Sequence, residues 1–218
     1  MSHPISIEQL RRRARVLRPS WLDAFDLAAV AVFAWEGATI ARGAGMNALG
    51  IVLAAFATGL FGGIMRDLLL GRLVPATLRT VRYPAVALAA GGLVCLLGDR
   101  EHAVPSGLVT ILDAGGLGLC CVTGALTALT CGAGAFVATL LGAMTAVGGG
   151  AVRDLLLDQV PTMLRVNLYV VAAGAAVTVA AVKLGRSRPQ AMAAGAVVAS
   201  MVCLLAAWEH WGLPIPHA

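Results

Sequence analysis

The amino-acid sequence predicts an all-α integral membrane protein of seven transmembrane helices, arranged as two inverted three-helix repeats plus a terminal helix. Three observations lead to this fold class. Of the 218 residues, 59% are hydrophobic and only 12% are charged, whereas soluble domains carry roughly 25% charged residues. Seven apolar segments have about the length of a membrane span, and the motif in Phe61–Gly71 recurs in Gly148–Asp158.

The seven expected spans follow from the length that a helix needs to cross a bilayer. At a rise of 1.5 Å per residue, about 20 mostly apolar residues cross the hydrocarbon layer. The 26 glycines favour closely packed helices, because small residues let backbones approach one another in lipid. The expected spans are Leu22–Ala41, Asn47–Met65, Tyr83–Leu97, Gly107–Leu129, Gly132–Val152, Leu168–Leu184 and Gln190–Trp208.

The basic residues indicate how the chain is oriented. An odd number of spans places the two ends of the chain on opposite sides of the membrane. With Arg66 and Arg153 set aside because they lie near membrane depth, eleven basic residues fall on the N-terminal side and three on the other. Cytoplasmic loops carry the excess of Lys and Arg. We therefore expect a multi-pass protein of the bacterial inner (cell) membrane with its N-terminus in the cytoplasm.

The expected spans divide the chain into four parts. Residues 1–20 form a basic N-terminal segment, 21–98 the first three-helix repeat, 107–184 the second, inverted repeat, and 189–211 the seventh transmembrane helix. The basic run before the first span is followed by an apolar segment of spanning length without a clear cleavage site. The first helix is therefore expected to be retained and not removed as a signal peptide.

An internal duplication explains the recurring motif. The stretch FGGIMRDLLLG (Phe61–Gly71) matches GGGAVRDLLLD (Gly148–Asp158). Further matched pairs are Asp26 with Asp113, Thr58 with Thr145, Pro75 with Pro161, Arg79 with Arg165, and Tyr83 with Tyr169. Each copy covers three spans, and three is odd. The second copy must therefore enter the bilayer upside down, related to the first by a pseudo-two-fold axis in the membrane plane.

Glycines interrupt the second and fifth spans at corresponding positions. They are Gly62 and Gly63 in one repeat and Gly148, Gly149 and Gly150 in the other. Glycine-interrupted spans in inverted repeats point to a transport site, because a break frees backbone carbonyl groups that could replace part of a cation's hydration shell. These spans would thus be opened at depth. The alternative interpretation is that the glycines are helix packing contacts.

An Arg-Asp pair follows each set of glycines, Arg66–Asp67 and Arg153–Asp154. A charge at the bilayer centre costs at least about 2.5–3.5 kcal/mol, so we expect these side chains to face a wet cavity or one another. Pairing within each motif and cross-repeat pairing, Arg66 with Asp154 and Arg153 with Asp67, are both open. In the alternative, each motif ends a span at the interface, where the arginine snorkels to the lipid headgroups.

Three further acidic residues are secondary candidates. Glu36 lies deep in the first span, where it is either a pathway residue or a buried, hydrogen-bonded acid. Asp26 and Asp113 match between the repeats but lie near the starts of spans. Capping of a helix N-terminus is the commoner role for an aspartate at such a position.

Several kinds of chemistry have no motif in this chain. There is no nucleotide-binding glycine loop, no HExxH and no His/Cys pattern with metal-ligand spacing, and the five cysteines lie in or at the ends of apolar segments without a CxxC spacing. The net charge of +5 is attributed to the basic loops and not to a nucleic acid partner. We expect no enzyme, no cofactor and no bound metal.

The duplicated glycine and RDLLL motifs, the proline that follows each, and the D…G first helix of each half resemble the prokaryotic members of the TRIC family, the trimeric intracellular cation channels. The resemblance covers about residues 21 to 208. It implies a homotrimer of seven-helix protomers, each with its own path for monovalent cations such as K⁺ or Na⁺. It also implies that the second and fifth helices line the pore at Gly62–Gly63 and Gly148–Gly150, with membrane lipids as further partners.

Two transport functions remain open from the sequence. The leading hypothesis is a passive K⁺ channel with one pore per protomer. The alternative is a secondary transporter of a small solute such as glycine, since helix N-termini and the guanidinium groups of Arg66 and Arg153 suit a substrate carboxylate. A membrane scaffold without transport activity is disfavoured, because it would not need paired ionisable residues within the spans.

Overall fold

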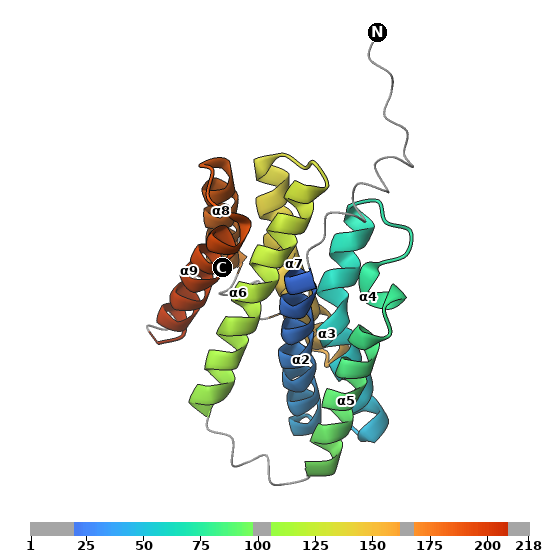
Figure 1. Cartoon of the computed structure of the whole chain (residues 1–218). Coiled ribbons are helices and arrows are strands. Elements are labelled where there is room, and N and C mark those ends of the chain that lie inside the picture. Colours follow the sequence, from blue (N-terminus) through green and yellow to red (C-terminus); the bar gives the residue numbers. More distant parts are fainter. Residues whose placement is uncertain (1–19, 98–105, 162–167, 209–218) are drawn as a thin grey trace, which may run out of the picture.

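The computed structural model describes residues 20–97, 106–161 and 168–208, and every regular element in these ranges is helical (Figure 1). The basic N-terminal segment and the end of the expected seventh helix beyond residue 208 lie outside the described residues. The helices are α2 (Ser20–Gly43), α3 (Ala48–Leu69), α4 (Ala76–Arg79), α5 (Arg82–Leu97), α6 (Ser106–Thr130), α7 (Ala135–Leu156), α8 (Leu168–Lys183) and α9 (Arg188–Trp208).

Each of the seven expected spans coincides with one helix other than the short α4. Within the described ranges, α2, α3, α6, α7 and α9 contain apolar stretches long enough to cross a membrane, and α5 and α8 are shorter apolar helices of 16 residues. Sixteen residues of helix reach only about 24 Å. The largest departure from expectation is at the ends of α3 and α7, which continue beyond the apolar stretch to include both Arg-Asp pairs.

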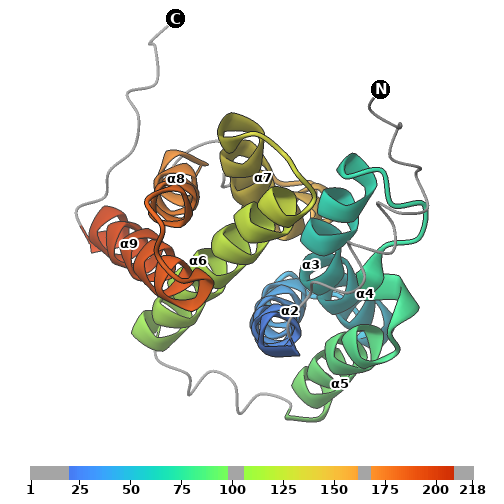
Figure 2. The ribbon, with the colours of Figure 1, turned by 45° about the horizontal axis from the view of Figure 1, so that its top comes forward.

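Two bundles with separate cores make up the molecule. In the first, α2, α3 and α5 pack around small side chains such as Ala34, Ala55 and Ala87, which are fully buried. In the second, α6, α7 and α8 enclose Val122 and Leu126, and α9 packs on α6 and α8. Figure 2 shows the two bundles side by side, with α2 and α3 facing α6 and α7.

The two bundles are inverted copies of one another. In Figure 1, α2 and α6 run in opposite directions, and so do α3 and α7. The likeness extends to the turn after each Arg-Asp pair. Gly71 and Asp158 occupy equivalent positions and both have left-handed backbones, with φ of 74° and 55°. The next residues, Arg72 and Gln159, donate backbone N–H bonds of 2.9 and 2.8 Å to the carbonyls of Asp67 and Asp154.

The glycines of the repeated motif let α3 and α7 cross at very short distance. A Cβ on Gly62 would lie 2.2 Å from the backbone oxygen of Thr145, and a Cβ on Gly149 would lie 2.1 Å from that of Thr58. These four residues form two equivalent pairs in the duplicated sequence. The crossing therefore lies on the pseudo-two-fold axis, and glycine is required there because any side chain would meet backbone of the other repeat.

The expected breaks at these glycines are wrong for this structure. Both α3 and α7 are helical without interruption through Gly62–Gly63 and Gly148–Gly150. A glycine in a helix is unfavourable by about 1 kcal/mol relative to alanine, but the i to i−4 hydrogen bonds and neighbouring apolar residues suffice to keep the helix intact. The packing interpretation of Gly62 and Gly149 is the one that the structure supports.

Candidate ion-transport site

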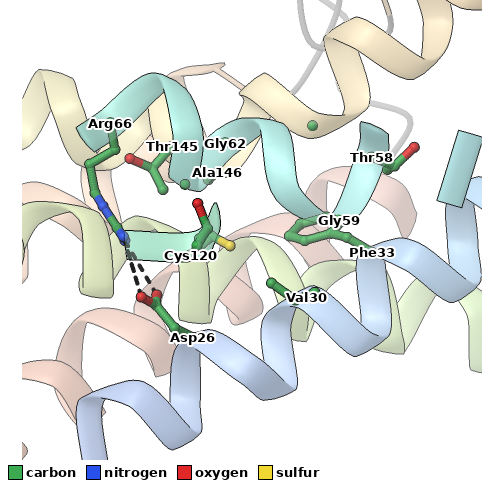
Figure 3. A pocket seen from close by; sticks show the side chains of 13 residues that line it. Asp26, Val30, Phe33, Thr58, Gly59, Gly62, Arg66, Cys120, Thr145 and Ala146 are labelled. Atoms are coloured by element: carbon green, nitrogen blue, oxygen red, sulfur yellow. Dashed lines mark hydrogen bonds and ion pairs between the residues drawn. The ribbon is translucent and has the colours of Figure 1, made fainter. Parts of the chain in front are cut away.

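The first charged cluster joins the C-terminal end of α3 to α2. The Arg66 side chain is only 1% exposed and donates from Nη1 and Nη2 to the carboxylate of Asp26, at 3.3 Å each, as Figure 3 shows. Arg66 Nε also donates to Oδ1 of Asp67, at 3.3 Å. A guanidinium in this arrangement neutralises two buried carboxylates with its fork of donors, which suits the geometry of arginine and not of lysine.

Asp67 connects α3 to the short helix α4. Its side chain is fully buried and accepts from Arg72 Nη1 on Oδ1 at 3.0 Å. Its Oδ2 accepts from the backbone N–H of Ala76, the first residue of α4, at 2.7 Å. The N-cap position of α4 is Pro75, which makes no side-chain cap. A carboxylate at a helix N-terminus satisfies an otherwise unpaired donor. Asp67 therefore caps α4, although it lies nine residues before Ala76 in the sequence.

The second charged cluster has a different composition. Arg153 of α7 donates to Asp154 Oδ1 from Nε and Nη2, both at 2.8 Å. Its Nη1 donates to Oε1 of Glu36, which belongs to α2 and hence to the other repeat. The side chains of Arg153 and Glu36 are 9% and 13% exposed. Asp113 of α6 lies beside this group, within reach of Glu36, Arg153 and Asp154.

Of the two predicted pairing arrangements, pairing within each motif is observed and cross-repeat Arg-Asp pairing is not. Each arginine contacts the aspartate that follows it, because the long guanidinium side chain folds back over the adjacent carboxylate. The proposed cross-repeat pairs, Arg66 with Asp154 and Arg153 with Asp67, do not form among the described residues. A cross-repeat ion pair does form, but its acidic partner is Glu36.

Two details of the alternatives from the sequence are also wrong. Arg66 does not snorkel toward lipid headgroups and Asp67 does not lie beyond the helix, because both side chains are buried inside the protein in the last turn of α3. Asp26 is not a helix N-cap: it is the seventh residue of α2 and binds Arg66. Asp113 is likewise well inside α6, which begins at Ser106. Of the two readings of Glu36, the buried, hydrogen-bonded acid describes its contacts.

A small cavity lies at the crossing of the helices and reaches the first cluster (Figure 3). Its volume is about 20 Å³, enough for about one water molecule. Lining residues come from α2, α3, α4, α6 and α7 and include Asp26, Thr58, Gly62, Arg66, Thr145 and Gly149. A hydrated cation is larger than one water molecule, so the cavity as it stands does not hold one.

Sequence reasoning overlooked the threonines and the cysteine at this cavity. Thr58 and Thr145 are buried, each donates its hydroxyl hydrogen to a carbonyl four residues earlier, and their matched positions in the repeat were the available signal. Thr77 from α4 is 2% exposed, and its Oγ1 has no hydrogen-bond partner among the described residues. Cys120 completes the wall from α6. Nothing local in the sequence marks Thr77 or Cys120.

Comparison with known proteins shows which families this chain resembles. The family described as Glycine transporter matches residues 23–99 and 110–184, one stretch for each repeat. A UPF0126 membrane protein of Vibrio cholerae is 30% identical over 91% of this chain and 84% of its own length. The UPF0126 inner membrane protein YadS of Escherichia coli K12 is 30% identical over 70% of this chain and 72% of its own length.

Solved structures identify the family by fold and sequence together. A TRIC cation channel, solved to explain conductance, superposes with a TM-score of 0.83 at 31% identity, over 90% of this chain and 97% of that one. The chain belongs to the prokaryotic TRIC family. The TRIC trimeric intracellular cation channel orthologue from Rhodobacter sphaeroides gives a TM-score of 0.81, also at 31% identity, over 88% of this chain and 100% of that one.

Membership of the TRIC family confirms the predicted fold class. TRIC channels are seven-helix proteins with inverted repeats, and this chain reproduces that architecture over almost its whole length. The relatives with curated names are membrane proteins, which agrees with the apolar helices found here. The chain is thus a multi-pass membrane protein whose structure supports a cation channel.

Proposed function

We propose that this TRIC protein conducts monovalent cations, K⁺ or Na⁺, by a passive path through each protomer of a homotrimer. The observation that carries the proposal is the crossing of α3 and α7, where the cavity meets the Arg66–Asp26 pair. The likeness to TRIC cation channels at 31% identity supports it. Burying ion pairs is costly, so the presence of the Arg66–Asp26 pair beside the crossing of α3 and α7 favours a role in transport.

The proposed path runs along the two glycine motifs and the charged clusters. Asp26 and Glu36 both belong to α2 and lie ten residues apart, about 15 Å along the helix axis. A cation would move between these carboxylates past the crossing. The pathway residues are Gly62, Gly63, Arg66 and Asp67 from α3 and Gly148, Gly149, Gly150, Arg153 and Asp154 from α7, with Glu36, Asp26 and Asp113 as secondary members.

The setting of this function is also part of the proposal. The positive-inside bias supports a cytoplasmic N-terminus. The E. coli relative is named an inner membrane protein, which supports an inner (cell) membrane location. The R. sphaeroides orthologue is a trimeric intracellular cation channel, which supports a homotrimer. Membrane lipids complete the list of proposed partners; the transported cation is cargo and not a cofactor, and no catalytic role is proposed.

A second candidate function rests on the description of the matched family, Glycine transporter. A zwitterion needs one group that binds a carboxylate and one that binds an ammonium ion. Arg66 and Asp26 both line the cavity and could serve the two groups, but they now bind each other. Glycine binding would therefore require this ion pair to open and the cavity to enlarge well beyond 20 Å³.

Reconstitution separates the two candidates. Purified protein in planar bilayers should give unitary K⁺ currents, because only a channel passes ions fast enough for resolvable single steps. Proteoliposomes loaded for labelled glycine uptake should show no saturable uptake. Saturable uptake without unitary currents would establish the transporter instead. If neither appears in vesicles that contain correctly assembled protein, both candidates are wrong.

Matched variants test whether the charged clusters belong to the path. Asp67→Asn and Asp154→Asn each remove a buried charge next to an arginine, whereas Asp158→Asn removes an exposed charge on the turn after α7. At least one of the first two should change conductance several-fold while trimers still form. The Asp158→Asn control should conduct like the wild type. Equal flux in all three variants would place the path elsewhere.

A further inference from the structure

The short helix α4 covers the cavity from one side. It packs mainly on α3 and α5 of the first repeat (Figure 2). The side chain of Thr77 is 2% exposed and lines the cavity, whereas the next two residues, Leu78 and Arg79, are exposed. A single layer of chain, a helix of four residues, therefore separates this part of the cavity from the surface.

Thr77 fits against Gly63 where α4 meets α3. A Cβ on Gly63 would lie 2.7 Å from Cγ2 of Thr77 and 3.8 Å from its Cβ. The two glycines of the α3 motif thus serve different neighbours, because Gly62 meets the backbone of Thr145 in α7. The missing side chain at Gly63 is what lets Thr77 reach the cavity.

The hydroxyl group of Thr77 does not hold α4 in place. Its Oγ1 is buried and has no hydrogen-bond partner among the described residues. Thr58 and Thr145, which also line the cavity, each donate to a carbonyl of their own helix. A buried hydroxyl without a partner is unfavourable, and water would satisfy it if α4 moved outward. The position of α4 therefore depends on contacts other than this hydroxyl.

Asp67 supplies such contacts from the end of α3. Its Oδ2 accepts from the backbone N–H of Ala76 at 2.7 Å, and its Oδ1 accepts from Arg72 Nη1 at 3.0 Å. The Arg72 side chain is 24% exposed, so water competes for it and the ion pair is weaker than a fully buried one. The equivalent of Arg72 in the second repeat is the uncharged Gln159.

We propose that α4 is a movable plug of the cavity, with Thr77 as the residue that closes it and the Asp67–Arg72 ion pair as its latch. Outward movement of α4 removes the thinnest wall of the cavity, enlarges the space beside Gly63 and lets water reach Thr77. The crossing of α3 and α7 stays intact, because α4 packs mainly on α3 and α5. The effect of the plug on flux rests on the proposed function, whereas the latch does not.

A disulfide between α3 and α4 tests the plug. In the double variant Gly63→Cys/Thr77→Cys the two Cβ atoms would lie 3.8 Å apart, which matches the mean separation in disulfides. Mass spectrometry of the oxidised protein should find this cross-link. Flux should then fall to that of empty vesicles and return on reduction, whereas the wild type and both single variants should not respond to oxidation. A complete cross-link with unchanged flux, or no cross-link in assembled protein, would overturn the proposal.

Arg72→Gln tests the latch, and Arg79→Gln is its control because it removes the same charge from the exposed side of α4. Hydrogen exchange of the Ala76 amide, which donates to Asp67, should be up to about fivefold faster in Arg72→Gln, as expected for loss of a partly exposed ion pair. Flux should rise by a similar factor, and Arg79→Gln should match the wild type in both measurements. Equal exchange in the two variants would refute the latch, and this comparison decides alone if the double variant does not assemble or passes no solute even when reduced.

Failure of the plug and failure of the proposed function give different results. If the reduced double variant passes cations or glycine and the cross-linked protein passes as much, the plug is wrong and transport stands. If the wild type passes neither solute while the cross-link forms and Arg72→Gln speeds exchange at Ala76, the proposed function is wrong and the latch stands.

Discussion

Replacing Gly149 by alanine tests the assignment of the repeated glycines as the crossing point of α3 and α7. The new Cβ would lie 2.1 Å from the backbone oxygen of Thr58, and ordinary contact begins at about 3.4 Å. The two helices must therefore separate locally by about 1.3 Å. Backbone cannot rotate away as a flexible side chain does, so no rotamer change relieves the clash.

The magnitude follows from two opposing effects. Overpacking costs about 1–3 kcal/mol, and the rigid backbone neighbour places Gly149→Ala at the upper end of that range. Alanine is favoured over glycine in a helix by about 1 kcal/mol. The net loss of stability is therefore about 2 kcal/mol, which lowers the unfolding temperature of a chain of this size by roughly 4–8 °C.

Gly150→Ala provides the matched control on the next residue of the same helix. Its Cβ would meet only Arg153 Nη2, at 3.8 Å, so the propensity gain stands alone and the variant should be as stable as the wild type or slightly more so. Thermal unfolding of the detergent-solubilised protein, followed by tryptophan fluorescence and by elution of the assembled species, measures both variants. Equal stability of the two would refute the close crossing.

Three further predictions concern the charged cluster, the turns and the topology. Arg66→Met leaves the carboxylates of Asp26 and Asp67 buried without their arginine and should cost about 3–5 kcal/mol; an unfolding midpoint within error of the wild type would exclude this pairing. Gly71→Ala, at φ 74°, should cost about 1–2 kcal/mol because alanine is strained there, as a shift in the same midpoint shows. Cys131 is exposed in the loop between α6 and α7, which lies in the cytoplasm if the N-terminus does. In a variant that keeps Cys131 as its only cysteine, a thiol reagent that cannot cross membranes should therefore label inverted vesicles and not intact spheroplasts. The opposite labelling pattern would reverse the orientation.

The spans and the duplication could be predicted from the sequence alone. A span is recognised from a local run of apolar residues, and the duplication from matching one half of the sequence with the other. A run of apolar residues specifies a membrane helix whatever it packs against. The odd number of spans in each copy then requires inversion, and the structure shows α2 and α6 in opposite directions. The candidate residues Arg66, Asp67, Arg153 and Asp154 were also found in this way, because charges in an apolar segment stand out.

The partners of those charges could not be predicted in the same way. Glu36 binds Arg153 across 117 positions of sequence, and only the docking of one repeat against the other brings them together. Helical periodicity places Arg66 and Asp67 on faces about 100° apart, yet the flexible arginine side chain reaches back to its neighbour. The role of Asp67 as a cap of α4 likewise needs the turn that returns Ala76 to it.

The sequence by itself determined a seven-helix membrane protein made of two inverted repeats, because hydrophobic length and duplication are properties of the chain alone. The tertiary structure decided what the glycines and charges do. Intact helices α3 and α7 cross where Gly62 and Gly149 have no side chain, and the buried charges are balanced by partners on neighbouring helices. Close packing and charge neutralisation depend on atoms that only the folded chain brings within reach.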